Sequence, residues 1–135
     1  MLLFIAVSGE LARFLSVEGV ERDDQSALLR AQARGDVDAM LNQLSGCRRR
    51  PSCVATVRAN ASRLRGPGEP KILSLKSPTA YSLTGASGTT RLAWTVIGRL
   101  PVVQCVDVRR TGNALTGIKI ELRSLSAPIP NSGDC

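Results

Sequence analysis

Gly66-Pro67-Gly68-Glu69-Pro70 divides the chain into two halves whose apolar residues repeat with different periods. Before this stretch, apolar residues recur three and four positions apart, which is typical of helices with one buried face. After it, apolar and polar residues alternate, which is typical of strands. Glycine and proline end helices and favour turns. The sequence therefore predicts an α+β domain in which the helices come first and the sheet follows.

The first half predicts helices separated by a short junction. The first runs to about Arg34, either as one long helix or as two helices separated near Gly19. In the two-helix version, Asp23 and Asp24 would lie at a helix start, where the helix dipole favours negative charge. Gly35 is expected to end this helix and Asp36 to cap the next one. The buried faces of the second and third helices are predicted to be Val37, Met40, Leu41 and Leu44, then Val54, Val57, Ala61 and Leu64.

The second half predicts four or five strands joined by short turns. Short connections between consecutive strands indicate an antiparallel meander. Turns are expected at residues 85–88, 98–100 and 111–113. The expected strands cover residues 71–76, 79–83, 89–97, 101–110 and 115–125.

Side-chain alternation predicts which strand residues face the core. Leu92, Trp94 and Val96 share one face of their strand. On the next strand the more apolar set is Gln104, Val106 and Val108. Cys105, Asp107 and Arg109 should therefore lie on the opposite, outer face.

Length and composition indicate one globular domain with a basic surface. The 135 residues are 43% hydrophobic, and the net charge is +7. This charge favours acidic partners such as nucleic acid, anionic lipid or acidic wall polymer. The basic residues are dispersed and aromatic residues make up only 3%, which argues against nucleic-acid binding. The only run of three, Arg48-Arg49-Arg50, is the candidate contact for an anionic partner.

The N-terminal residues 1–20 carry a short apolar run, Met1–Val7. It is too short to cross a bilayer, which needs about 20 apolar residues. Two interpretations remain open: the end of a membrane segment that tethers the domain, or the first turns of a buried helix. The α+β domain itself is expected over residues 21–126, followed by a tail at residues 127–135.

Four cysteines and the absence of histidine limit the chemistry. Of the three pairings that four cysteines allow, Cys47–Cys53 with Cys105–Cys135 is favoured, because it clips a loop between helices and ties down the tail. Such bridges imply an oxidising compartment. The alternative is four free thiols in a cytosolic protein. The spacing does not match the close ligand pairs of structural zinc sites, so no metal is expected.

The predicted elements follow one another in this order: helices first, then the junction Arg34-Gly35-Asp36-Val37, and then an antiparallel sheet. In this order of elements the chain resembles the nuclear transport factor 2-like superfamily. This resemblance implies a cystatin-like α+β roll, in which a curved antiparallel sheet wraps around helices into a cone. It also implies a pocket at the open end of the cone, for which Tyr81, Trp94 and Gln104 are the candidate lining residues. Bacterial envelope proteins of this type, tethered by an N-terminal membrane helix, resemble the chain most closely.

The best enzymatic arrangement would use Asp107 as a general base and Tyr81 as an oxyanion donor, in the style of ketosteroid isomerase-like relatives. Strand alternation places Asp107 on the outer face of the sheet, which argues against a role as general base inside a pocket. We therefore expect a non-catalytic, extracytoplasmic binding or scaffold domain without a cofactor. The expected partner is a small apolar ligand or a protein, and a homodimer stays open. The alternatives are an isomerase- or hydratase-like enzyme, and a basic module for acidic wall polymer or anionic lipid.

Overall fold

The computed structural model describes residues 19–76, 86–113 and 117–135. Helices occupy the first part of the chain: a helix through residues 19–34, then α2 (Val37–Gln43), the short 3-10 helix η1 (Cys47–Arg49) and α3 (Pro51–Arg63). The second part forms β1 (Lys71–Lys76), β2 (Ala86–Thr95), β3 (Val102–Asn113) and β4 (Gly117–Leu125). The predicted α+β class is confirmed.

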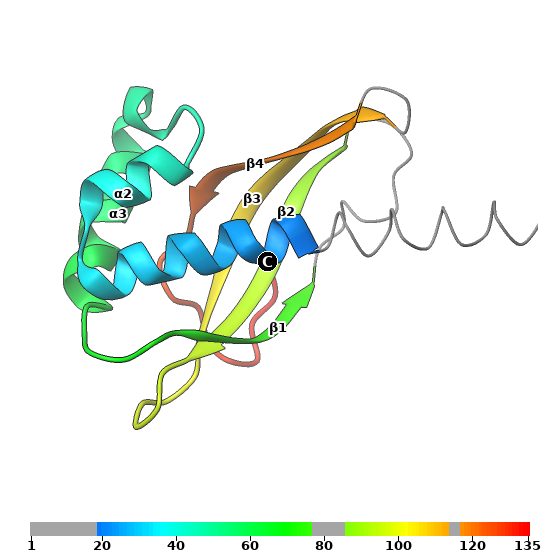
Figure 1. Cartoon of the computed structure of the whole chain (residues 1–135). Coiled ribbons are helices and arrows are strands. Elements are labelled where there is room, and N and C mark those ends of the chain that lie inside the picture. The colour runs from blue at the N-terminus through cyan, green and yellow to red at the C-terminus, as the bar shows by residue number, and fades with distance from the viewer. Residues whose placement is uncertain (1–18, 77–85, 114–116) are drawn as a thin grey trace, which may run out of the picture.

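The four strands form one open antiparallel sheet in the order β1-β2-β3-β4. The first helix crosses one face of this sheet, and α2 and α3 lie together near one end of that helix (Figure 1). Consecutive strands are neighbours throughout, which is the predicted meander. The strand expected at residues 79–83 lies outside the described residues.

The junction between the first helix and α2 is built as predicted. Gly35 has a φ of 68°, and its N–H donates to the carbonyl of Gln32 at 3.0 Å. The Asp36 N–H donates to the carbonyl of Ala31 at 2.9 Å, which completes a Schellman ending. The Asp36 side chain then accepts a hydrogen bond from the Ala39 N–H at 3.1 Å and caps α2.

Within the described residues the first helix is continuous from residue 19 to residue 34, and Asp23 and Asp24 lie inside this stretch. The residues before 19, which would distinguish one helix from two, lie outside the described part of the chain.

Two predictions at strand ends are wrong. Residues 86–88 belong to β2, because Ala86 pairs with Arg110, and are not part of a turn. Residues 111–113 extend β3, because Asn113 still pairs with Gly117. In both hairpin cases, pairing with the neighbouring strand outweighs the local turn preference of glycine and asparagine.

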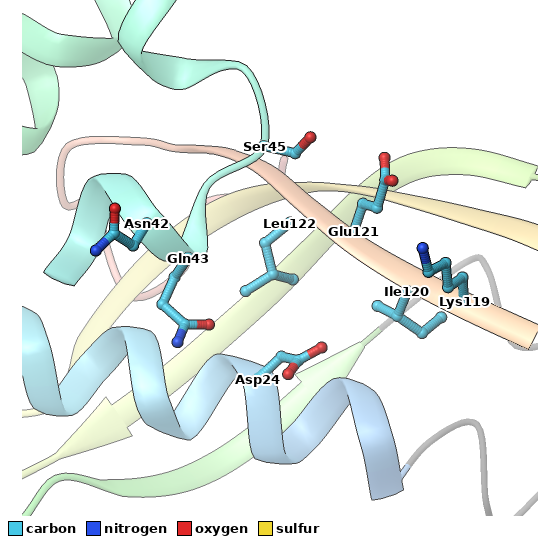
Figure 2. A pocket seen from close by; sticks show the side chains of 8 residues that line it. All are labelled: Asp24, Asn42, Gln43, Ser45, Lys119, Ile120, Glu121 and Leu122. Atoms are coloured by element: carbon cyan, nitrogen blue, oxygen red, sulfur yellow. The ribbon is translucent and has the colours of Figure 1, made fainter.

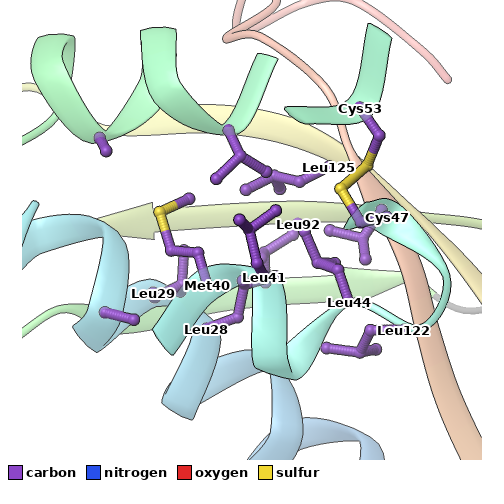
Figure 3. Packing of buried hydrophobic residues seen from close by; sticks show 14 of the residues in the cluster. Leu28, Leu29, Met40, Leu41, Leu44, Cys47, Cys53, Leu92, Leu122 and Leu125 are labelled. Atoms are coloured by element: carbon purple, nitrogen blue, oxygen red, sulfur yellow. A yellow bond between two sulfur atoms is a disulfide. The ribbon is translucent and has the colours of Figure 1, made fainter. Parts of the chain in front are cut away.

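The core lies between the helices and the sheet (Figure 3). Leu28 and Leu29 of the first helix are fully buried, as are Met40 of α2 and Val57 of α3. From the sheet, Leu92, Val106, Leu122 and Leu125 contribute the opposing layer. With few aromatic residues available, aliphatic side chains and Trp94 fill this space.

Strand alternation assigns the two sheet faces correctly. Val106 and Val108 are buried against the helices, whereas Asp107 and Arg109 are exposed. Across the described part of the chain, no helix is both long enough and apolar enough to span a bilayer. The apolar run Met1–Val7, on which the predicted tether depends, lies outside the described residues.

Candidate functional site

Two disulfides hold the chain, and their pairing is the favoured one. Cys47 and Cys53 clip η1 to the start of α3, and Cys105 of β3 is bonded to the last residue, Cys135. Structural disulfides of this kind are typical of proteins in an oxidising environment. The alternative of four free thiols is excluded in this structure.

The C-terminal tail is fixed to the sheet by more than its disulfide. Arg91 donates from Nε to the carbonyl of Gly133 at 2.9 Å and from Nη2 to the carbonyl of Asn131 at 2.6 Å. The Ile129 N–H donates to the carbonyl of Val103 at 2.8 Å. The Ile129 contact is an antiparallel bridge at the edge of β3, and the residues after it cross the outer face of the sheet, where Arg91 and Cys105 lie.

A buried network of amide groups fills the interior between the first helix and the sheet. Gln104 of β3 accepts from Trp94 Nε1 at 2.8 Å and forms a reciprocal pair with Gln32 of the first helix, both bonds at 3.1 Å. Its Nε2 also donates to the carbonyl of Ser126 at 3.0 Å, which accepts from Asn60 of α3 as well. Trp94 and Gln104, the expected pocket residues, are thus buried and bonded to each other.

A second group of buried polar side chains lies nearer the N-terminus of the same helix than Gln32 does. Glu21, only 1% exposed, accepts a hydrogen bond from the Thr90 hydroxyl of β2 at 2.7 Å. Gln25, one turn later, is fully buried, and neither of its amide atoms has a hydrogen-bond partner among the described residues. Arg110 of β3 is also buried. This group was not identified from the sequence. Arg110 lies two residues after Val108 on β3, so strand alternation alone would have placed its side chain on the inner face.

An open pocket of about 380 Å³ lies between the first helix, α2 and β4 (Figure 2). Because the Ser45 N–H donates to the carbonyl of Leu122 at 2.7 Å, the segment after α2 lies against the edge of β4 there. Burial, followed by the charges of Asp23 and Glu21, raises the pKa of the Asp24 carboxyl above its ordinary value. The residues that line the pocket are Asp24, Asn42, Gln43, Ser45, Lys119, Ile120, Glu121 and Leu122.

This lining is suited to hydrogen bonding rather than to the apolar ligand expected from the sequence. It offers carboxylates from Asp24 and Glu121, the ammonium group of Lys119 and two side-chain amides. None of the predicted site residues that the structure describes contributes to it. In the part of the chain that the structure describes, no three side chains of the histidine, cysteine and acidic types gather as metal ligands would.

The run Arg48-Arg49-Arg50 is not a set of three free cations. Arg48 donates from Nη2 to Asn42 Oδ1 at 2.9 Å and lies 3.8 Å from the Asp38 carboxylate. Arg50 donates to the carbonyls of Gly46 and Ser45, at 3.3 and 3.2 Å, and also to the carbonyl of Arg123. Two of the three arginines therefore stabilise the cysteine-clipped loop and its contact with β4.

Asp107 is exposed on the outer face of the sheet, away from the interior. Its two carboxylate oxygens accept hydrogen bonds from Thr89 at 3.0 Å and from Ser124 at 2.8 Å. These contacts bridge neighbouring strands and leave Asp107 in water, so it is not placed to act as a base inside the fold. Tyr81, the oxyanion donor of that hypothesis, lies outside the described residues.

Comparisons with known proteins add no relative. No protein-family model, no curated protein and no solved structure matches the chain.

Proposed function

We propose that the chain is a non-catalytic, extracytoplasmic binding or scaffold domain built on a nuclear transport factor 2-like roll. The order of its elements supports this: helices, a Gly-Asp junction, and then an antiparallel meander whose inner face packs on the helices. The two disulfides support an extracytoplasmic location, because such bridges form and persist where the environment is oxidising.

The observation that carries the proposal is the bonded interior around Gln104. A ligand container of this fold would need a hollow lined by Trp94 and Gln104. Instead, the Trp94 indole, the Gln104 amide and the Gln32 amide satisfy one another in a buried cluster. A filled interior favours a scaffold that acts through its surface, with a protein or a second copy of the chain as the partner.

The single tryptophan provides the test. Trp94 is buried and donates to Gln104, so its emission reports on the interior directly. We expect 8-anilinonaphthalene-1-sulfonate, a probe of accessible apolar cavities, to leave the Trp94 emission of the folded protein unchanged. Urea-unfolded protein, in which the emission shifts to the red, is the control. A saturable change that persists when the exposed Ile97 and Leu100 are replaced by serine would show an interior site and contradict the scaffold proposal.

The compartment is tested separately. Thiols are trapped with an alkylating reagent in intact cells of the source organism, and the mass of the isolated chain is measured. We expect all four cysteines to remain unmodified because they are bonded in pairs. A chain alkylated at these cysteines would place the protein in a reducing compartment and contradict the extracytoplasmic location.

A further inference from the structure

The turn between β2 and β3 exposes two large aliphatic side chains. Ile97 is 87% exposed and Leu100 is 85% exposed, more than the other exposed large hydrophobic residues of the described chain, Val20 and Leu73. The turn projects past the helices and the other strands (Figure 1). Exposed aliphatic side chains that stand together mark interaction sites more often than isolated ones do.

The fold itself does not require these two side chains. The turn is closed by the Arg99 N–H, which donates to the carbonyl of Val96 at 3.0 Å. Gly98 supplies the left-handed conformation, with a φ of 86°, and the Thr95 hydroxyl donates to the carbonyl of Arg99 at 3.2 Å. Backbone geometry and Thr95 therefore hold the turn, while Ile97 and Leu100 face solvent.

Two cationic side chains, those of Arg99 and Lys71, belong to this apolar tip and its base. Arg99 lies between the two aliphatic residues and donates from Nη2 to the carbonyl of Arg65 at 3.3 Å, so the Arg65 backbone is next to it. Lys71, exposed, pairs in register with Thr95 at the base of the turn. Glu69 is an acidic residue two positions before Lys71. Its carboxylate oxygen Oε1 lies 3.5 Å from Nη1 of Arg30, so the positive charge of Arg30 offsets part of the negative charge of this carboxylate.

We propose that this β2–β3 tip docks the domain on an anionic lipid bilayer. Ile97 and Leu100 enter the interface between headgroups and acyl chains, while Arg99 and Lys71 contact lipid phosphates. A narrow, convex tip can penetrate a soft surface, whereas binding a protein would require a deep complementary groove. The net charge of +7 attracts the whole domain to such a membrane. This surface is separate from the interior, so the inference stands independently of the scaffold proposal.

The test is sedimentation of the oxidised full chain with vesicles. Binding is expected with phosphatidylcholine mixed with phosphatidylglycerol, and it should weaken as salt is raised. Vesicles of phosphatidylcholine alone should bind much less. Ile97→Ser with Leu100→Ser should lower the partition coefficient about tenfold or more, because the two side chains supply the buried apolar area. Arg99→Gln should lower it about fivefold.

Two matched controls keep the test specific. Leu73→Ser removes an aliphatic side chain that is 56% exposed on β1 rather than on the tip, and Arg49→Gln removes an exposed cation from the cysteine-clipped loop. Both should bind as the unchanged chain does. The proposal is overturned if the unchanged chain fails to bind anionic vesicles, or if the tip variant binds as well as the Leu73→Ser control. Because the tip side chains make no core contacts, circular dichroism should show every variant folded.

Discussion

Gln104 bonds three partners at once in the interior: the indole of Trp94, the amide of Gln32 and the carbonyl of Ser126. Replacing it by leucine would keep the volume and remove all of these bonds. The Trp94 indole and the Gln32 amide would then stay buried without these hydrogen bonds, at a cost of about 1–3 kcal/mol for a group of this kind. The Ser126 carbonyl, by contrast, would keep its bond from Asn60. We expect Gln104→Leu to lower the free energy of unfolding by about 3 kcal/mol, measured by urea denaturation. The exposed Gln43→Leu is the control and should change little.

Gln25 should behave in the opposite way. It is as buried as Gln104, yet its two amide atoms have no partner within the described residues. An amide taken out of water without compensating bonds destabilises the fold, so an apolar side chain of similar volume should be better tolerated. We expect Gln25→Leu to raise the free energy of unfolding by about 1 kcal/mol in the same urea measurement. A loss of stability would show that the Gln25 amide does have a partner.

For Gln104, the sequence could predict the face of the sheet on which the side chain lies but not its hydrogen-bond partners. Strand alternation correctly placed Gln104 on the inner face, because side-chain direction follows from the backbone period alone. It could not give the partner, because Gln32 is 72 residues away in the chain. Gln104 was therefore interpreted as pocket lining rather than as part of a bonded core. Predicting a bond of this kind requires the packing of the helix on the sheet.

At the scale of elements, the junction after the first helix depends on Gly35. Its φ of 68° is costly for any residue with a Cβ, and a Cβ there would lie 2.9 Å from Arg65 Cδ and 3.3 Å from the carbonyl oxygen of Ala61. Gly46 has a similar φ of 71° with no atom within 4 Å of such a Cβ, so it isolates the backbone cost. We expect Gly46→Ala to lower the unfolding free energy by about 1 kcal/mol and Gly35→Ala by clearly more. Equal losses in thermal or urea unfolding would mean that Arg65 and α3 simply move aside.

The ends of the strands were harder to predict than the end of this helix. A helix ending is encoded locally, in a glycine that can take a positive φ and an aspartate that caps the next turn. Residues 86–88 and 111–113 also contain glycine, yet they are strand residues: residues 86–88 pair with residues 108–110, and residues 111–113 pair with residues 117–119. Local preference is weak in strands compared with pairing and burial. The order of helices and strands followed from the sequence, as did the bounds of β1, whereas η1 and the ends of β2 and β3 did not.

At the scale of the whole molecule, the two disulfides act on different parts of one core. Cys47–Cys53 fixes the loop that Arg50 joins to the end of β4, and Cys105–Cys135 fixes the tail that Arg91 holds against β2. Cys105–Cys135 therefore attaches the tail to the sheet, Cys47–Cys53 joins η1 to α3, and neither bridge joins the helices to the sheet. The helices and the sheet are held together by apolar packing and by the Gln104 network.

The two bridges should consequently contribute unequally, and mainly through the unfolded chain. A bridge restricts the unfolded state more strongly when it closes a longer loop, and the sequence separations are 6 residues for Cys47–Cys53 and 30 for Cys105–Cys135. We expect replacing Cys47 and Cys53 by serine to lower the unfolding free energy by about 2 kcal/mol, and replacing Cys105 and Cys135 by about 4 kcal/mol. Urea denaturation of each double variant, with the other bridge intact, measures both losses. If the shorter loop proved the more costly to open, the Arg50 contacts that depend on it, rather than loop entropy, would control stability.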